Sequence, residues 1–133
     1  MDIDELVGNF ELFDNWEDKY SYIIELGKDL PLISSNYKTE DRLIKGCQSR
    51  VWLHAEEKEG KMYYSADSDA IITKGIIALL IRVINDETPE TIAKAEFSFI
   101  KEIGLQEHLS PTRSNGLVSM IKQMKVEALR YAK

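Results

Sequence analysis

The chain has 133 residues, of which 44% are hydrophobic and 30% are charged, a composition typical of one soluble folded domain and not of a disordered segment. A formal net charge of −6 argues against tight binding to nucleic acid or anionic lipid, so we expect proteins or small molecules as partners. The single cysteine, Cys47, excludes an internal disulfide, a CxxC redox pair and a metal site built on several thiolates. We expect one domain that spans residues 1–133.

The first residues are acidic and lack the basic and apolar regions of a secretory signal peptide. We therefore expect a cytoplasmic protein. The most apolar stretch, Gly75 to Ile81, is bounded by Lys74 and Arg82. It is much shorter than the roughly 18 apolar residues that a membrane-spanning helix needs, so we expect no membrane association.

Two amphipathic helices are predicted at the start of the chain. Apolar residues recur at helical spacing over residues 3–13, with Asp2 as a candidate N-cap, and again over 16–27 after the candidate N-cap Asn15. The second helix should end before Pro31, because a residue that precedes proline disfavours the helical conformation.

Three short runs with strand-like alternation follow, over residues 42–45, 51–57 and 61–67. The link Lys58-Glu59-Gly60 is short enough for a hairpin turn, so the last two runs should pair antiparallel. Alternate residues of the 51–57 run share one apolar face, which we expect to pack on helices. The opposite face should be partly wet, and it carries Trp52, His54 and Glu56.

The rest of the chain is predicted to be helical. Residues 68–85 are apolar nearly all round and should form the central buried helix, with Asp69 as a cap of its first turn. Thr88 precedes a short helix, and a last helix should follow Ser110 and Pro111. The predicted fold class is α+β, with a small antiparallel sheet of about three strands packed with helices.

Charge is unevenly distributed along the chain. Residues 1–20 hold seven acidic side chains and one lysine, whereas residues 113–133 hold five basic side chains and one acidic one. This pattern fits complementarity to helix dipoles, with acids early in the first helix and bases late in the last. The sharper interpretation is a basic face on which an acidic protein docks, and both interpretations stay open.

Cys47 lies in a polar connection between the first two strand-like runs. A lone cysteine is often an inert buried side chain. This one follows a glycine and has Gln48 and Ser49 as neighbours. Lys45 and Arg50 are also close in sequence, and nearby cations favour a thiolate over a thiol. The residues alone therefore support both an inert and a reactive Cys47.

A cysteine hydrolase would need a histidine base, and the candidates are His54, on a strand, and His108, which we expect to be structural. Metal-ligand spacings such as HxxxH, CxxC or HExxH are absent, and the glycines are isolated, so we predict no bound metal, phosphate loop or cofactor. The remaining chemistry is thiol exchange with a sulfur that a partner holds.

Four segments in order resemble the SufE-like sulfur acceptors. Residues 15–31 (NWEDKYSYIIELGKDLP) resemble the N-terminal helical region of that family, and Gly46-Cys47-Gln48-Ser49 with Val51-Trp52 resembles its active-cysteine loop. Residues 67–75 (DSDAIITKG) resemble the start of its central helix, and residues 108–117 (HLSPTRSNGL) its last motif. Four such segments in register are far more specific than any one of them.

The resemblance implies an accessory protein of a pyridoxal-phosphate-dependent, SufS-like cysteine desulfurase in iron–sulfur cluster assembly. Cys47 matches the thiol that accepts persulfide sulfur, which then passes to a cluster scaffold complex. Arg113 matches the arginine of the SP[ST]R motif, which contacts the partner or orients the cysteine loop. The partner-binding candidates are Gln48, Ser49, Arg50, Asp69 and Arg113.

The implied fold is similar to that of IscU-type scaffolds, which use several cysteines. With one cysteine, this chain should carry sulfur and not build clusters. A persulfide survives only when it is shielded from cellular thiols, so Cys47 should be partly sheltered. The alternative is a non-covalent activator or binding module of a desulfurase that serves another sulfur-delivery route.

Overall fold

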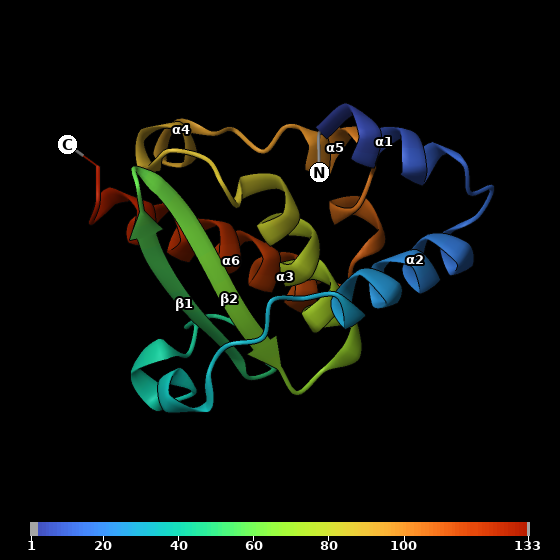
Figure 1. Cartoon of the computed structure of the whole chain (residues 1–133). Coiled ribbons are helices and arrows are strands. Elements are labelled where there is room, and N and C mark those ends of the chain that lie inside the picture. The colour runs from blue at the N-terminus through green and yellow to red at the C-terminus, as the bar shows by residue number, and fades with distance from the viewer. Residues whose placement is uncertain (1–2, 133) are drawn as a thin grey trace.

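A β-hairpin and one buried helix form the centre of the fold, and the other helices pack around them (Figure 1). The computed structural model describes residues 3–132. Its helices and strands are α1 (Ile3–Glu11), α2 (Trp16–Lys28), β1 (Val51–Lys58), β2 (Lys61–Ser68), α3 (Ile71–Ile84), α4 (Pro89–Lys94), α5 (Phe99–Glu102) and α6 (Pro111–Leu129). Short 3-10 turns cover Ser35–Tyr37, Glu40–Arg42 and Gln106–His108. Within the described range, no helix combines the length and the hydropathy that crossing a membrane requires.

Three helices begin where the sequence predicts, each at a side-chain cap. The cap residues are Asn15, Thr88 and Ser110. The side-chain oxygen of each accepts a hydrogen bond of 2.9 to 3.3 Å from the backbone N–H three residues further along the chain. Such caps satisfy backbone donors that the first helical turn leaves free. The second helix ends before Pro31, as predicted. The candidate cap Asp2 lies outside the described residues.

The predicted hairpin is confirmed. β1 and β2 pair antiparallel from Val51 opposite Ser68 to Lys58 opposite Lys61. Glu59 and Gly60 form the two-residue turn with φ values of 54° and 81°, the left-handed conformation that such a turn requires. One face of β1 is buried and the other is half-buried, as the alternation predicts.

The expected third strand is wrong, and the sheet has two strands. Residues 40–42 form a 3-10 turn, after which Leu43 makes only an isolated bridge to Trp52. Between this bridge and β1 the chain makes a turn in which Gly46 has a φ of 92°. On the other edge, Leu32 makes an isolated bridge to Ala66 of β2. The α+β class is correct, but isolated bridges, and not a third strand, flank the hairpin.

The central helix α3 is buried along most of its length. Every residue from Ile76 to Ile81 is at most 2% exposed. α3 packs against α2, β2 and α6, so helices and the hairpin cover most of its circumference. The Tyr64 hydroxyl also donates a 2.7 Å hydrogen bond to the Met124 carbonyl, which links β2 to α6 across the core.

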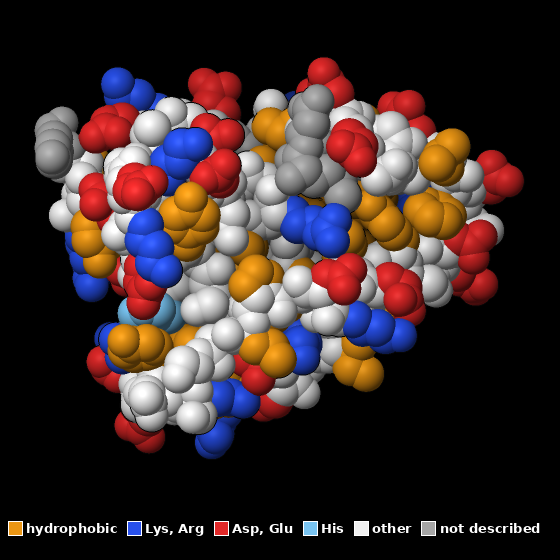
Figure 2. Space-filling view, in the orientation of Figure 1, with side chains coloured by type: hydrophobic (Ala, Val, Ile, Leu, Met, Phe, Trp, Pro, Cys, Tyr) orange, Lys and Arg blue, Asp and Glu red, His pale blue; other side chains and the backbone are white. Residues whose placement is uncertain are grey.

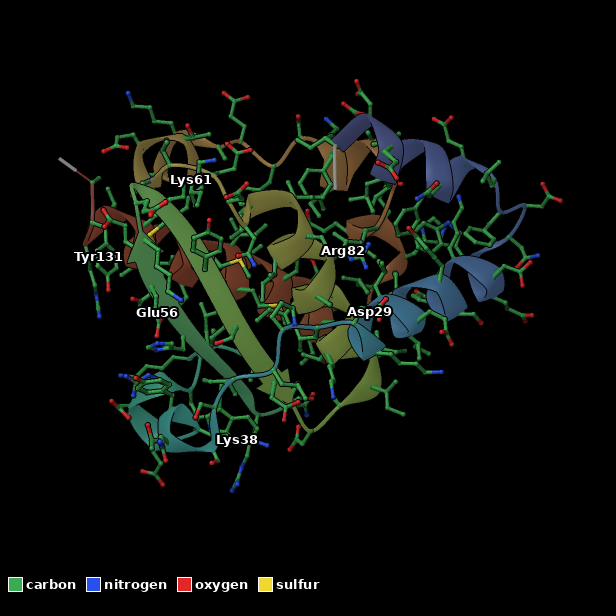
Figure 3. The ribbon with its side chains drawn as sticks, viewed as in Figure 1. Asp29, Lys38, Glu56, Lys61, Arg82 and Tyr131 are labelled. Atoms are coloured by element: carbon green, nitrogen blue, oxygen red, sulfur yellow. The ribbon has the colours of Figure 1, made fainter. Side chains whose placement is uncertain are left out.

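α2 and α3 cross at a pair of glycines. A Cβ on Gly27 would lie 3.1 Å from the backbone nitrogen of Gly75, and a Cβ on Gly75 would overlap the carbonyl of Ile23. The two backbones are therefore in direct contact, which side chains larger than hydrogen would prevent. Arg82 and Asp29 add an ion pair of 3.4 Å between α3 and the end of α2 (Figure 3).

Replacing Gly75 by alanine should destabilise the protein. The added methyl group would overlap the Ile23 carbonyl, and overpacking of this kind costs about 1–3 kcal/mol of the free energy of unfolding. The matched control is Gly8→Ala in α1, where a Cβ meets nothing within 4 Å and helix propensity predicts a gain of up to about 1 kcal/mol. Urea unfolding of both variants measures the difference, and equal stabilities would contradict the tight crossing.

Candidate functional site

The loop of residues 46–50 carries Cys47, and we call it the cysteine loop. It lies directly on α6. A Cβ on Gly46 would overlap the Ser119 hydroxyl oxygen, so the loop backbone touches the helix at this point. The Cys47 thiol lies 3.6 Å from the carbonyl oxygen of Gly116, to which it can donate a weak hydrogen bond. A Cβ on Gly116 would lie 3.5 Å from Sγ. The cysteine loop therefore rests on two small residues one turn apart, Gly116 and Ser119. We call this contact surface on α6 the seat of the loop.

Cys47 also borders a cavity of about 280 Å³ between its loop, α3 and the start of α6. The loop contributes Cys47, Gln48 and Ser49 to the walls. The helices and the α6 cap contribute Thr73, Ile76, Ser110, Thr112, Arg113, Gly116 and Met120. The walls thus combine apolar side chains with hydroxyl groups and one guanidinium, beside a single thiol.

The thiol is half-buried, in agreement with the expected shelter. Burial raises the pKa of Cys47 above its ordinary value, because a thiolate would lose hydration in this position. Lys45 and Arg50, the nearby cations that could favour a thiolate, are both exposed to solvent, and burial of the sulfur sets the direction of the pKa shift. In this position, burial therefore favours the protonated thiol over the thiolate.

Asp69 holds the end of the cysteine loop and does not cap α3. The N-cap of α3 is Ala70, without a side-chain hydrogen bond, so the predicted capping role of Asp69 is wrong. Asp69 Oδ1 instead accepts a 3.1 Å hydrogen bond from the N–H of Arg50, and its own N–H donates to the Arg50 carbonyl. These two hydrogen bonds join the last loop residue before β1 to the segment that precedes α3.

Arg113 lies in the first turn of α6, on the cavity side. Its backbone N–H donates to the Ser110 cap, while its side chain is exposed and lines the cavity with Cys47. Its guanidinium forms no ion pair with any residue of the described part of the chain. The structure thus brings Gln48, Ser49 and Arg113 to the cysteine, whereas Arg50 is exposed outside the cavity walls.

A family model described as "Fe-S metabolism associated domain", SufE, matches residues 4–128. The chain belongs to the SufE family. Uncharacterized SufE-like proteins of Rhizobium etli and Rhizobium meliloti are each 37% identical to it over 131 residues. The alignments cover 95% of this chain and 88% and 94% of those proteins.

The fold also resembles a solved structure. The solution structure of a hypothetical protein from Thermus thermophilus matches with a TM-score of 0.80 over 96% of this chain and 93% of that one. The sequence identity is 20%, so this similarity concerns the fold alone. It agrees with the α+β architecture described above.

Three of the four SufE-like segments meet at the cavity. The cysteine loop, the first turns of α3 and the start of α6 all contribute residues to its walls, although they lie far apart in the sequence. The fourth segment, residues 15–31, forms α2 and packs against α3 instead. This segment contributes Gly27 to the glycine crossing, and none of its residues lines the cavity.

Neither histidine borders the cysteine cavity of this SufE-family protein. His54 stacks on Tyr37 with ring centroids 3.9 Å apart, and its Nε2 lies 3.0 Å from Glu56 Oε1. His108 stacks on Trp16 at 4.0 Å and bonds the Gly104 carbonyl through Nδ1, which confirms its structural role. Over residues 3–132, no three His, Cys, Asp or Glu side chains are grouped so that they could hold a metal ion.

Several residues around Cys47 were not predicted from the sequence. Thr73 is a buried polar residue of the central helix, and a hydroxyl among core-facing apolar side chains is a detectable signal. Gly116 and Ser119 are small residues three positions apart on one helix, a pattern that permits close backbone approach. Met120 carries no signal of its own, because any apolar side chain fits the predicted stripe.

The raised pKa of Cys47 predicts slow alkylation at neutral pH. Because the thiolate is the nucleophile, the pH at which the iodoacetamide rate reaches half its maximum should be higher in the folded protein than in the same chain unfolded in urea. Mass spectrometry of the alkylated fraction over a pH series, from neutral to strongly alkaline, measures both profiles. A lower midpoint in the folded protein would contradict the burial of the thiol.

Removing the Asp69 carboxylate should loosen the cysteine loop. The hydrogen bond that Arg50 donates to it contributes about 1 kcal/mol, so Asp69→Ala should raise the alkylation rate of Cys47 about fivefold. Asp69→Asn keeps an acceptor oxygen and should stay close to the wild type. If both variants react at the wild-type rate, Asp69 does not hold the loop.

Proposed function

We propose that this protein accepts sulfur on Cys47, as a persulfide, from a pyridoxal-phosphate-dependent cysteine desulfurase of the SufS type, and passes it to an iron–sulfur cluster scaffold complex. Membership of the SufE family supports a role in Fe–S metabolism and sulfur transfer. The single observation that carries the proposal is a half-buried lone thiol beside a small cavity, on a loop that few contacts hold in place.

The transfer moves the terminal sulfur of a persulfide from one cysteine to another. The Cys47 thiolate attacks the terminal sulfur of the donor persulfide, a new S–S bond forms at Cys47, and the old S–S bond to the donor cysteine breaks. The proton that Cys47 loses ends on the donor thiolate. Because the sulfane sulfur keeps its oxidation state, the step needs no further oxidant or reductant.

The seated loop is a protected state and not the reacting state. A protonated thiol is a poor nucleophile, so Cys47 must leave its seat to react in the partner's active site. Its restraints are weak: a 3.6 Å contact with Gly116, the backbone contact on Ser119 and the hydrogen bonds at Asp69. After transfer, the adjoining cavity offers the persulfide a place away from other thiols.

The residues around Cys47 have the chemistry to guide this exchange. Gln48 and Arg113 are exposed at the cavity rim and offer N–H donors to a partner or to a sulfur anion. Ser49 lies in the same wall, and Arg50 is exposed at the point where the loop meets β1. We assign partner binding to these four residues, and Asp69 a role in positioning the loop that carries them.

Incubation with a cysteine desulfurase and free cysteine should add one sulfur atom to the protein, mapped to Cys47 by mass spectrometry of its peptides. The chemistry requires that thiol, so Cys47→Ser should carry no added sulfur. An equally labelled Cys47→Ser variant would contradict the assignment. Stimulation of desulfurase turnover by Cys47→Ala, without added reductant, would support the alternative of a non-covalent activator.

A further inference from the structure

A second groove, of about 680 Å³, lies between β1, residues 41–45 and the C-terminal half of α6. We call it the basic groove because four cations line it: Arg42, Lys45, Lys122 and Arg130. Two acidic residues, Asp41 and Glu127, line it as well. The groove is thus locally positive in a chain whose net charge is −6.

Two of the four cations are uncompensated. Arg42 lies 3.6 Å from Asp41, and Arg130 lies 3.5 Å from Glu127. Lys45 and Lys122, on opposite walls, form no ion pair or hydrogen bond with any residue between 3 and 132. An anionic ligand is the partner that neutralises both.

Helix dipoles do not account for the basic side chains of α6. The last turn of α6 contains no basic residue, and only Arg130, at the C-cap, lies where the dipole favours a cation. Lys122 lies in the middle of the helix and Arg113 in its first turn, where a cation is unfavourable. Of the two interpretations of the charge pattern, the docking face is therefore the better supported.

One wall of the groove is held rigid before any ligand binds. The Arg42 guanidinium lies 4.5 Å over the Tyr37 ring, and its Nε donates a 3.2 Å hydrogen bond to His54 Nδ1. Because His54 accepts at Nδ1, its ring proton is on Nε2, facing Glu56. A fixed cation loses little conformational entropy on binding an anion.

The spacing of the charges favours an extended chain over a single small anion. Lys122 and Arg130 are eight positions apart on α6, which separates them by about 12 Å along the helix axis. An extended peptide covers that distance in about four residues at roughly 3.3 Å each. One phosphate ion is too small to contact Lys122 and Arg130 together. Tyr131 marks the far end of the groove (Figure 3).

The groove adjoins the cysteine loop. Lys45 is two residues before Cys47, and Ser119, which seats Gly46, lines the groove as well. We propose that the basic groove binds an extended acidic segment of the protein that exchanges sulfur with Cys47. The identity of that protein rests on the proposed function, whereas the acidic segment rests on the charges of the groove.

The groove is tested first without any partner protein. An octaglutamate peptide, titrated into ¹⁵N-labelled protein at low salt, should shift the amide signals of residues 42–45 and 119–131, and octaglutamine should not. Reversing one uncompensated charge with Lys122→Glu should raise the dissociation constant about fivefold. The matched control is Lys101→Glu, which reverses another exposed lysine, on α5, a helix that contacts α1 and lies outside the groove walls.

Three results would overturn the proposal: shifts spread over the whole surface, equal weakening by Lys101→Glu, or displacement of the peptide by an equal concentration of inorganic phosphate. The first two indicate non-specific charge attraction, and the third a small-anion site.

The second arm uses the full desulfurase. Its dissociation constant should rise with Lys122→Glu and not with Lys101→Glu, and added salt should reduce the difference. Suppose that the wild type accepts sulfur and that Lys122→Glu binds the desulfurase as tightly as the wild type. The groove proposal then fails and the proposed function stands. If the wild type accepts no sulfur, the proposed function fails while the peptide titration still decides the nature of the groove.

Discussion

The burial of α3 is the constraint on which the rest of the structure depends. A helix that is apolar nearly all round is stable only when other elements cover it on most sides. α2 covers one side through the backbone contact of Gly27 and Gly75, and β2 and α6 cover others. This arrangement brings the start of α6 close to the start of α3, and the cysteine loop lies across both.

The same packing determines the chemical state of Cys47. Small residues of α6 let the loop lie close to the helix, and the resulting burial raises the pKa of the thiol. A sulfur carrier gains from this, because a sheltered thiol or persulfide reacts slowly with other cellular thiols. Only a few weak contacts and the hydrogen bonds at Asp69 hold the loop in this position.

Charged side chains are unevenly distributed over the surface. Acidic side chains gather over α1 and α2, as Figure 2 shows, whereas the basic groove lies along β1 and the second half of α6. The cysteine loop separates that groove from the cavity beside Cys47. A partner that occupies the groove, as we propose, would therefore approach Cys47 from a defined side.

The sequence by itself determined the features that depend on neighbouring residues: the caps at Asn15, Thr88 and Ser110, the hairpin turn, the buried helix and the polar loop of Cys47. Its SufE-like segments also indicated the family. Only the tertiary structure decided that residues 42–45 form no strand, that Asp69 holds Arg50, and that burial raises the pKa of Cys47. These features, like the basic groove, depend on burial and on partners distant in sequence, because hydrogen bonds and hydration are set by what packs against a residue.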